Sequence, residues 1–244
     1  MTIRQAMILA AGLGTRLRPI TDTTPKPLVK IGGRAMIDYA LDALADAGVT
    51  HAVVNVHHHA DQMEAHLSRF DRMQITISDE RDGLLNSGGG LKQGLRFLRR
   101  EPLYVMNADL FWVGEPPGQA SNLSRLADFF DPERMDIAML CVDPQRMTGH
   151  NGKMDFSIGS RGNLQRFRDG MSDPVVYAGA LILPHQLLDD APADAFNLNI
   201  YFDKAIAAGR LYGQRLTGHW ITVGTPEAIG EAEEVLADFA MVEK

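Results

Sequence analysis

The sequence predicts an α/β protein with a mixed, mostly parallel sheet flanked by helices. Short apolar runs typical of buried strands alternate with stretches whose apolar residues recur at helical spacing. The 244 residues suffice for one large domain, and 45% hydrophobic and 23% charged residues are ordinary for a globular protein. Strand–helix alternation implies right-handed crossovers between parallel strands, so ligands are expected beyond the carboxyl ends of the strands.

The predicted elements cover most of the chain. Strands are expected over 6–11, 52–56, 73–78, 103–106, 136–142, 164–167, 175–183 and 211–216, and helices over 37–47, 60–70, 87–100, 121–130, 199–208 and 226–239. Ser87 and Asn199 are expected to cap their helices, and Thr225 with Pro226 is expected to start the last one. The glycine-rich stretch 143–163 predicts an irregular hairpin region.

A glycine loop follows the first predicted strand. Gly12 and Gly14 allow a tight turn whose backbone N–H groups point at one site, an arrangement that suits a phosphate chain. The loop is not a Walker A sequence, and Leu17 replaces the third glycine of the dinucleotide fingerprint. Positive charge is concentrated around it, in Arg16, Arg18, Lys26, Lys30 and Arg34.

Lys26 stands between two prolines a short way beyond this loop. Pro27 disfavours the helical region for residue 26 and Pro25 has a fixed φ, so we expect an extended backbone at Lys26. An ammonium group presented in this way next to a phosphate loop indicates a catalytic or binding role.

Residues 9–28, LAAGLGTRLRPITDTTPKPL, resemble the signature of the sugar-1-phosphate nucleotidyltransferase family. The resemblance extends over nearly all of the chain. It implies a single Rossmann-like nucleotidyltransferase domain over residues 1–244. Residues 1–142 would form the nucleotide-binding part, and residues 143–244 a smaller sugar-binding lobe with the C-terminal helix.

The resemblance also implies a reaction. A sugar 1-phosphate oxygen attacks the α-phosphorus of a nucleoside triphosphate, and pyrophosphate leaves. Arg16 would hold the triphosphate and stabilise the pyrophosphate, and Lys26 would bridge the α-phosphate and the incoming phosphate. The residues expected to bind the nucleotide are Ala11, Gly12, Gly14, Thr15, Arg16, Lys26 and Gly88.

A magnesium ion is the expected cofactor. Asp109 follows the predicted strand over 103–106, where a carboxylate is well placed to hold Mg²⁺ against phosphates. The resemblance makes Asp109 a catalytic metal ligand and places Asn107 beside the sugar or nucleotide. The family pattern Trp-x-Asp supplies a second carboxylate, but Thr222 occupies that position here, and a hydroxyl is a weaker ligand.

Two glycine positions have both a functional and a structural interpretation. Three glycines begin at Gly88, and the loop around them resembles the form found in N-acetylmuramate-1-phosphate uridylyltransferases, where it contacts the nucleoside. Gly179 resembles a sugar-contacting position. Tight packing at Gly88, and a bulge or packing role at Gly179, are the alternatives.

The expected substrates are UTP and N-acetylmuramate 1-phosphate. Mannose-1-phosphate guanylyl transfer and glucose-1-phosphate thymidylyl or uridylyl transfer are alternatives within the family, and choline-phosphate cytidylyl transfer is a more distant one in the same fold. A non-catalytic nucleotide-sugar-binding subunit is an alternative of another class. We expect a monomer or homodimer.

The composition argues against several other classes of protein. A net charge of −7 disfavours nucleic-acid binding. Cys141 is the one cysteine, so the sequence contains no disulfide framework. The consecutive histidines 57–59 predict a polar strand end, because adjacent side chains on a strand point in alternating directions and do not easily share one metal ion. No signal-peptide pattern and no long apolar run occur, so we expect a cytoplasmic protein without membrane partners.

Overall fold

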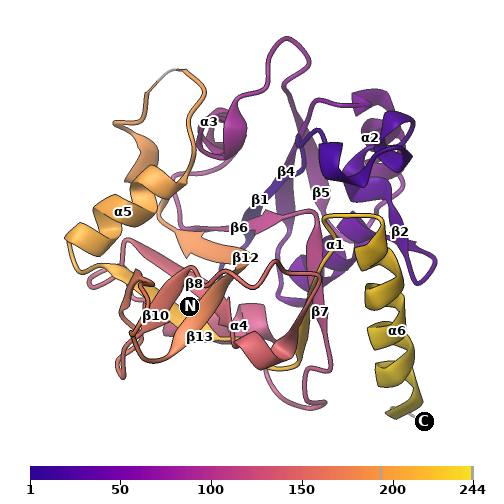
Figure 1. Cartoon of the computed structure of the whole chain (residues 1–244). Helices are drawn as coiled ribbons and strands as arrows, with labels where there is room; N and C mark the ends of the chain where they lie inside the picture. Colours follow the sequence, from indigo (N-terminus) through magenta and orange to yellow (C-terminus); the bar gives the residue numbers. More distant parts are fainter. Residues whose placement is uncertain (193, 243–244) are drawn as a thin grey trace.

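The computed structural model describes residues 1–192 and 194–242 and shows an α/β fold, with helices on both faces of a mixed sheet (Figure 1). The strands are β1 Gln5–Leu9, β2 Lys30–Ile31, β3 Arg34–Ala35, β4 His51–Val56, β5 Gln74–Asp79, β6 Leu103–Asn107, β7 Leu110–Val113, β8 Ile137–Val142, β9 Met147–Thr148, β10 Phe156–Ile158, β11 Leu164–Arg166, β12 Pro174–Leu183, β13 Leu211–Arg215 and β14 His219–Thr222. The helices are α1 Met36–Asp46, α2 Ala60–Leu67, α3 Asn86–Gly94, α4 Asn122–Phe129, α5 Asn199–Ala207 and α6 Glu227–Val242.

The central sheet joins the two halves of the chain. Its main strand order is β11-β10-β12-β6-β1-β4-β5, with β8 beside β12 and β13 beside β8. Strands β6, β1, β4 and β5 run parallel, and β12 lies antiparallel to β6. The carboxyl ends of β1, β4 and β6 therefore meet at one edge of the sheet, and both proposed parts of the domain share this sheet.

The sheet has a hydrophobic core on each face. Successive residues of β1, such as Met7 and Ile8, point to opposite faces and belong to different cores. Helices α1, α2 and α4 bury their apolar residues on the face of Ile8, whereas α3 and α5 cover the face of Met7. A third cluster packs α6 against β7 and β14.

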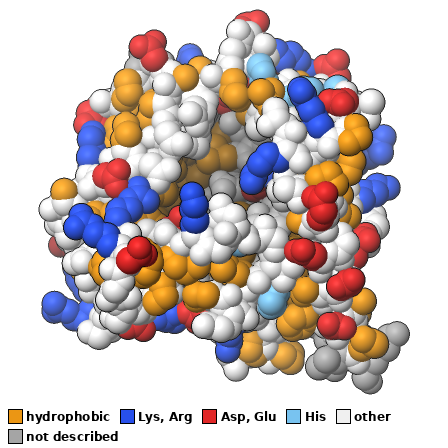
Figure 2. Space-filling model, viewed as in Figure 1, with side chains coloured by type: hydrophobic (Ala, Val, Ile, Leu, Met, Phe, Trp, Pro, Cys, Tyr) orange, Lys and Arg blue, Asp and Glu red, His pale blue; other side chains and the backbone are white. Residues whose placement is uncertain are grey.

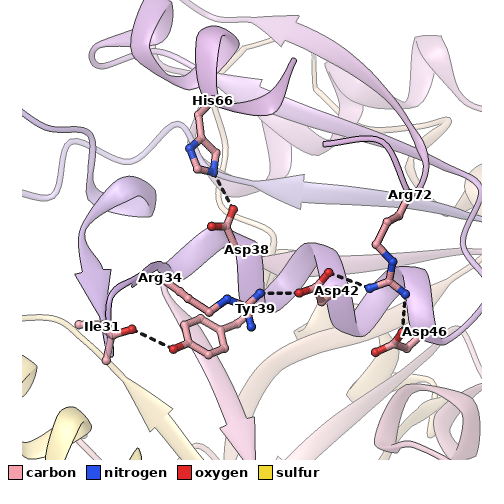
Figure 3. A network of polar contacts seen from close by, with 8 residues as sticks. All are labelled: Ile31, Arg34, Asp38, Tyr39, Asp42, Asp46, His66 and Arg72. Carbon is pink, nitrogen blue, oxygen red and sulfur yellow. Dashed lines mark hydrogen bonds and ion pairs between the residues drawn. The ribbon is translucent and has the colours of Figure 1, made fainter. Parts of the chain in front are cut away.

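Polar contacts fix the outer side of α1 (Figure 3). Asp42 and Asp46 of α1 both accept hydrogen bonds from Arg72, at 2.8 and 2.6 Å, and Asp38 contacts His66 of α2 at 2.6 Å. The Tyr39 hydroxyl donates to the Ile31 carbonyl, which ties α1 to the β2–β3 hairpin. These bonds orient α1 on the sheet while its opposite side packs into the core.

Helix α3 differs from the prediction. It begins at Asn86 rather than after a Ser87 cap, and a 3₁₀ turn over Leu95–Phe97 ends it before residue 100. The Ser87 hydroxyl instead accepts the backbone N–H of Leu198, 111 positions away in the chain. A contact between such distant residues cannot be inferred from local spacing.

The extended backbone expected at Lys26 is also wrong. Lys26 is the first residue of a 3₁₀ helix over Lys26–Leu28, and the carbonyl of Pro25 accepts the N–H of Leu28. Pro27 is tolerated because the first residues of a helical turn need no N–H partner within it. Pro25 itself is extended, with φ −63° and ψ 141°.

The short strands β7, β9 and β14 form a small sheet that the sequence analysis did not predict. Helix α6 begins at Glu227, one residue later than expected.

The histidines 57–59 each contact a different backbone carbonyl oxygen, as expected for a polar strand end: those of Glu80, Thr21 and Asp22. Over residues 1–192 and 194–242, no helix combines the length and hydrophobicity needed to cross a membrane.

Candidate active site

A cavity of about 450 Å³ lies at the carboxyl ends of β1, β4 and β6. It is lined by Leu9, Ala10, Ala11, Gly12, Lys26, Pro27, Asn55, Leu84, Asn86, Ser87, Asn107, Ala108, Asp109 and Ala195. In Figure 2 the molecule is hollowed near the centre of the face in view, with hydrophobic side chains in the hollow and basic ones near its border. This cavity, which we call the main pocket, lies where ligands of parallel sheets bind.

Lys26 and Asp109 form an ion pair in the main pocket. The Lys26 ammonium lies 2.5 Å from Asp109 Oδ2, and the lysine side chain is buried. Lys26 comes from the 3₁₀ turn after the glycine loop, whereas Asp109 follows β6, so the fold unites groups 83 residues apart. A cation and a carboxylate thus face one cavity, where they can act on the same ligand.

Gly14 allows the glycine loop to pack against Lys26. Its φ is +63°, and a Cβ there would lie 2.9 Å from both Lys26 Cβ and Thr21 Cγ2. The Thr21 hydroxyl also donates to the Gly14 carbonyl, at 2.8 Å. Only glycine fits this backbone conformation in so little space, so Gly14 sets the position of Lys26 relative to the loop.

A buried polar network supports the other side of the main pocket. The Asn55 side chain accepts the Ala10 N–H at 2.7 Å and donates to Glu80 at 2.7 Å. The second Glu80 oxygen accepts the N–H of Leu85, at the start of α3. The sequence pattern does not predict this network, although Asn55 is the polar residue in the strand run Ala-Val-Val-Asn-Val. The network ties the glycine loop to α3.

Arg16 lies outside the main pocket. It lines a neighbouring cavity of about 400 Å³ with Thr222, Gly224 and others, and a Cβ on Gly224 would lie 3.2 Å from Arg16 Nη2. Asp109 of the main pocket and Thr222 of this cavity are in contact, since the main-chain oxygen of Asp109 lies 3.5 Å from the Thr222 hydroxyl. The structure therefore brings Lys26 and Asp109 together in the main pocket and places Arg16 and Thr222 in the neighbouring cavity.

A second chamber of about 230 Å³ shares Leu9, Ser87 and Asn107 with the main pocket. Its other lining residues come from β10–β12 and the start of α5: Asp155, Phe156, Arg166, Tyr177, Asn197, Leu198, Asn199 and Phe202. Burial raises the pKa of the Tyr177 phenol, so this group stays neutral at physiological pH. The second chamber thus lies between residues 143–244, expected to form the sugar lobe, and three residues of the nucleotide-binding part, of which Asn107 borders both spaces.

Gly88 and Gly179 line neither of these spaces. The backbone N–H of Gly88 donates to the Phe196 carbonyl, and a Cβ there would lie 2.2 Å from the Phe196 ring. Gly179 has φ +72° at a register shift in β12 and packs on Leu110. In this structure both glycines have the packing roles given above as alternatives, and Asn86, Ser87 and Tyr177 line the spaces instead.

The residues present suit a magnesium ion that is bound mainly through substrate phosphates. Asp109 supplies a carboxylate at the main pocket, and the described residues contain no cluster of three His, Cys, Asp or Glu that could hold a metal alone. Mg²⁺ typically uses one or two carboxylates together with phosphates and water.

Comparison with known proteins identifies the class. The family model named nucleotidyl transferase matches residues 5–238, so the chain belongs to this family. The resemblance of residues 9–28 to the sugar-1-phosphate nucleotidyltransferases is thereby confirmed, and the family and its relatives support a sugar-1-phosphate nucleotidyltransferase enzyme.

Individual relatives narrow this class. The chain is 41% identical to N-acetylmuramate alpha-1-phosphate uridylyltransferase of Caulobacter vibrioides, over 96% of this chain and 97% of that protein. It is 31% identical to the enzyme of that name from Neisseria meningitidis serogroup B, over 94% and 96% of the two chains. The mannose-1-phosphate guanyltransferase of Saccharomyces cerevisiae is 30% identical, over 91% of this chain and 62% of that protein.

Solved structures share the fold. A putative glucose-1-phosphate thymidylyltransferase from Bacillus anthracis matches with a TM-score of 0.78 at 17% identity, covering 96% of each chain. The inositol-1-phosphate CTP transferase of T. maritima matches with a TM-score of 0.77 at 15% identity, over 98% of this chain and 97% of that one. The predicted α/β nucleotidyltransferase fold is confirmed.

Proposed function

We propose that the chain transfers a uridylyl group from UTP to N-acetylmuramate 1-phosphate and releases pyrophosphate. The observation that carries this proposal is the Lys26–Asp109 pair that lines the main pocket, in a chain 41% identical to an enzyme named for this reaction. The second chamber, which shares Asn107 with the main pocket, offers a place for the sugar.

In this proposal the protein acts by positioning and by neutralising charge. Two phosphate-bearing substrates repel each other, so cations must bring them together. The backbone of Ala11 and Gly12 faces the triphosphate, and Lys26 contacts the α-phosphate and the incoming sugar phosphate. Arg16, in the neighbouring cavity, binds the leaving pyrophosphate.

Asp109 is the proposed ligand of a magnesium ion, which when bound would supply further positive charge to the phosphates. Lys26, now paired with Asp109, remains available to a phosphate because an ammonium group has three donors. Gly14 packs against Lys26, and Thr15 begins the 3₁₀ turn Thr15–Leu17 that follows it, so both belong to the loop proposed to bind the triphosphate. Gly88, in the first turn of α3, packs against Phe196 and stays a proposed nucleoside contact.

A substrate matrix tests the proposal. UTP, CTP, GTP, ATP and dTTP are each combined with the 1-phosphates of N-acetylmuramate, N-acetylglucosamine, glucose and mannose, and pyrophosphate release is measured. We expect the highest kcat/KM for UTP with N-acetylmuramate 1-phosphate. A preference for GTP with mannose 1-phosphate would replace the proposed substrates, and no release from any pair over a wide range of Mg²⁺ concentrations would refute the transfer itself.

A further inference from the structure

The second chamber contains a cation that the reaction described so far does not use. Among the described residues that line it, Arg166 is the one basic side chain and Asp155 is the one acidic side chain. The phosphates of the substrates belong in the main pocket with Lys26. A cation in the second chamber therefore favours a sugar that itself carries an anionic group.

Three neighbours fix the orientation of Arg166. Its Nε donates to Asp203 at 2.8 Å, its Nη2 donates to Asn199 at 2.9 Å, and the guanidinium carbon lies 4.8 Å from the centre of the Phe156 ring. Among the described residues, Nη1 has no hydrogen-bond partner. A guanidinium held in this way binds a carboxylate at little further entropic cost.

The existing ion pair leaves Arg166 able to bind another anion. The Asp203 side chain is 61% exposed and that of Arg166 35% exposed, so solvent screens their attraction. Helix α5 begins at Asn199, beside the guanidinium, and its N-terminal dipole also favours negative charge. Asp155, the acidic residue of the chamber, makes no ion pair with Arg166; its Oδ2 accepts the N–H of Tyr177 at 2.9 Å.

We propose that Arg166 binds the lactyl carboxylate of the sugar and thereby selects N-acetylmuramate 1-phosphate over N-acetylglucosamine 1-phosphate. The two sugars differ in the lactyl ether on O3, which ends in a carboxylate. A forked guanidinium suits that group, with charge-assisted hydrogen bonds that a neutral hydroxyl cannot match. This inference rests on the proposed function and identifies the residue that determines its sugar specificity.

Kinetics on the two sugars provide the test. Arg166→Gln should lower kcat/KM for N-acetylmuramate 1-phosphate by about 10- to 100-fold, the range for a lost hydrogen bond to a charged group. With N-acetylglucosamine 1-phosphate, kcat/KM should stay within about twofold of the parent, because this sugar makes no such bond. Arg166→Lys should fall between, since it keeps the charge but loses the fork. Arg168→Gln is the matched control, at an exposed arginine two positions further along the chain, and should leave kcat/KM unchanged for both sugars.

Two outcomes would overturn the inference. Equal losses on both sugars would mean that Arg166 only supports the chamber, and unchanged kinetics on both would mean that it does not meet the carboxylate. Calorimetric binding of N-acetylmuramate 1-phosphate separates this inference from the proposed function. Arg166-dependent binding without pyrophosphate release would refute the function and support the inference. Turnover unaffected by Arg166→Gln would support the function and refute the inference.

Discussion

At the scale of single residues, Lys26 has the most direct link to catalysis. Replacing it with alanine should lower kcat/KM by about 100-fold, or about 3 kcal/mol, as for the loss of one electrostatic donor in other active sites. The change also leaves Asp109 without its partner at 2.5 Å. Steady-state kinetics should show the loss, while Lys30→Ala, at an exposed lysine of β2, should behave like the parent. Turnover of Lys26→Ala within a few-fold of the parent would exclude the proposed role.

Thr222 offers a change that should improve metal binding. Its hydroxyl lies 3.5 Å from the main-chain oxygen of Asp109, so a side chain at this position lies beside the proposed metal ligand. Because a carboxylate binds Mg²⁺ more strongly than a hydroxyl, Thr222→Asp should lower the Mg²⁺ concentration that gives half-maximal rate. Thr222→Ser keeps the hydroxyl and is the matched control. Identical Mg²⁺ titrations for the two variants would show that position 222 does not contribute to metal binding.

At the scale of elements, β12 contains a bulge that depends on Gly179. A Cβ there would lie 2.0 Å from Leu110 Cδ2, and φ is +72°. Gly170 also has a positive φ, +89°, but open space around it. Gly179→Ala should therefore lower the free energy of unfolding by about 1–3 kcal/mol more than Gly170→Ala, the usual effect of overpacking. Urea unfolding measures both variants.

A double variant identifies the source of that loss. Leu110→Ala removes the side chain that the new methyl group would meet, so Gly179→Ala should destabilise a Leu110→Ala background less than it destabilises the parent. Equal losses in the two backgrounds would attribute the effect to backbone strain alone. The bulge would then not depend on close packing against β7.

The predicted elements succeeded where a local pattern was long. The apolar run of β8 and the helical spacing of α1 each identify one element, because burial on a sheet requires those patterns. Strands β7 and β14 have four residues each and pair with each other across more than 100 positions, so their local signal was weak. The start of α3 was misplaced for a related reason, since Ser87 bonds to Leu198 rather than to its own helix.

At the scale of the whole molecule, the candidate site combines residues of very different predictability. Some could be predicted because they stand next to strand ends or in a long motif: the residues of the glycine loop, Lys26 and Asp109. The edge of the sheet that binds ligands could be inferred from the topology alone. The Asn55–Glu80 network and Arg166 could not be inferred, because their contacts depend on how β4, β5, β11 and α5 come together in three dimensions.

The stability of the whole fold should also depend on pH through three partly buried histidines. Burial lowers the pKa values of His51, His150 and His219 below the ordinary 6.5. The unfolded chain therefore binds more protons than the native state as the pH falls through about 6.5. The stabilisation is complete above that value and is lost progressively as the pH falls toward the lower native pKa values. Exposed carboxylates such as Asp79 and Asp189 have lowered pKa values in the native state. Their stabilising contribution is lost in a separate range, as the pH falls below their ordinary value of 3.8.

His219 separates this effect from ordinary loss of contacts. The free energy of unfolding, measured in urea between about pH 7.5 and about pH 5, should decrease with falling pH in the parent and less steeply in His219→Gln. Thr148→Ala removes the hydroxyl that lies 2.8 Å from His219 Nε2 but keeps the titrating ring, so it should lower stability while retaining a parent-like slope. A parent whose stability is constant or rises as the pH falls over this range would contradict the assignment, because three histidines with lowered pKa values must disfavour the native state there.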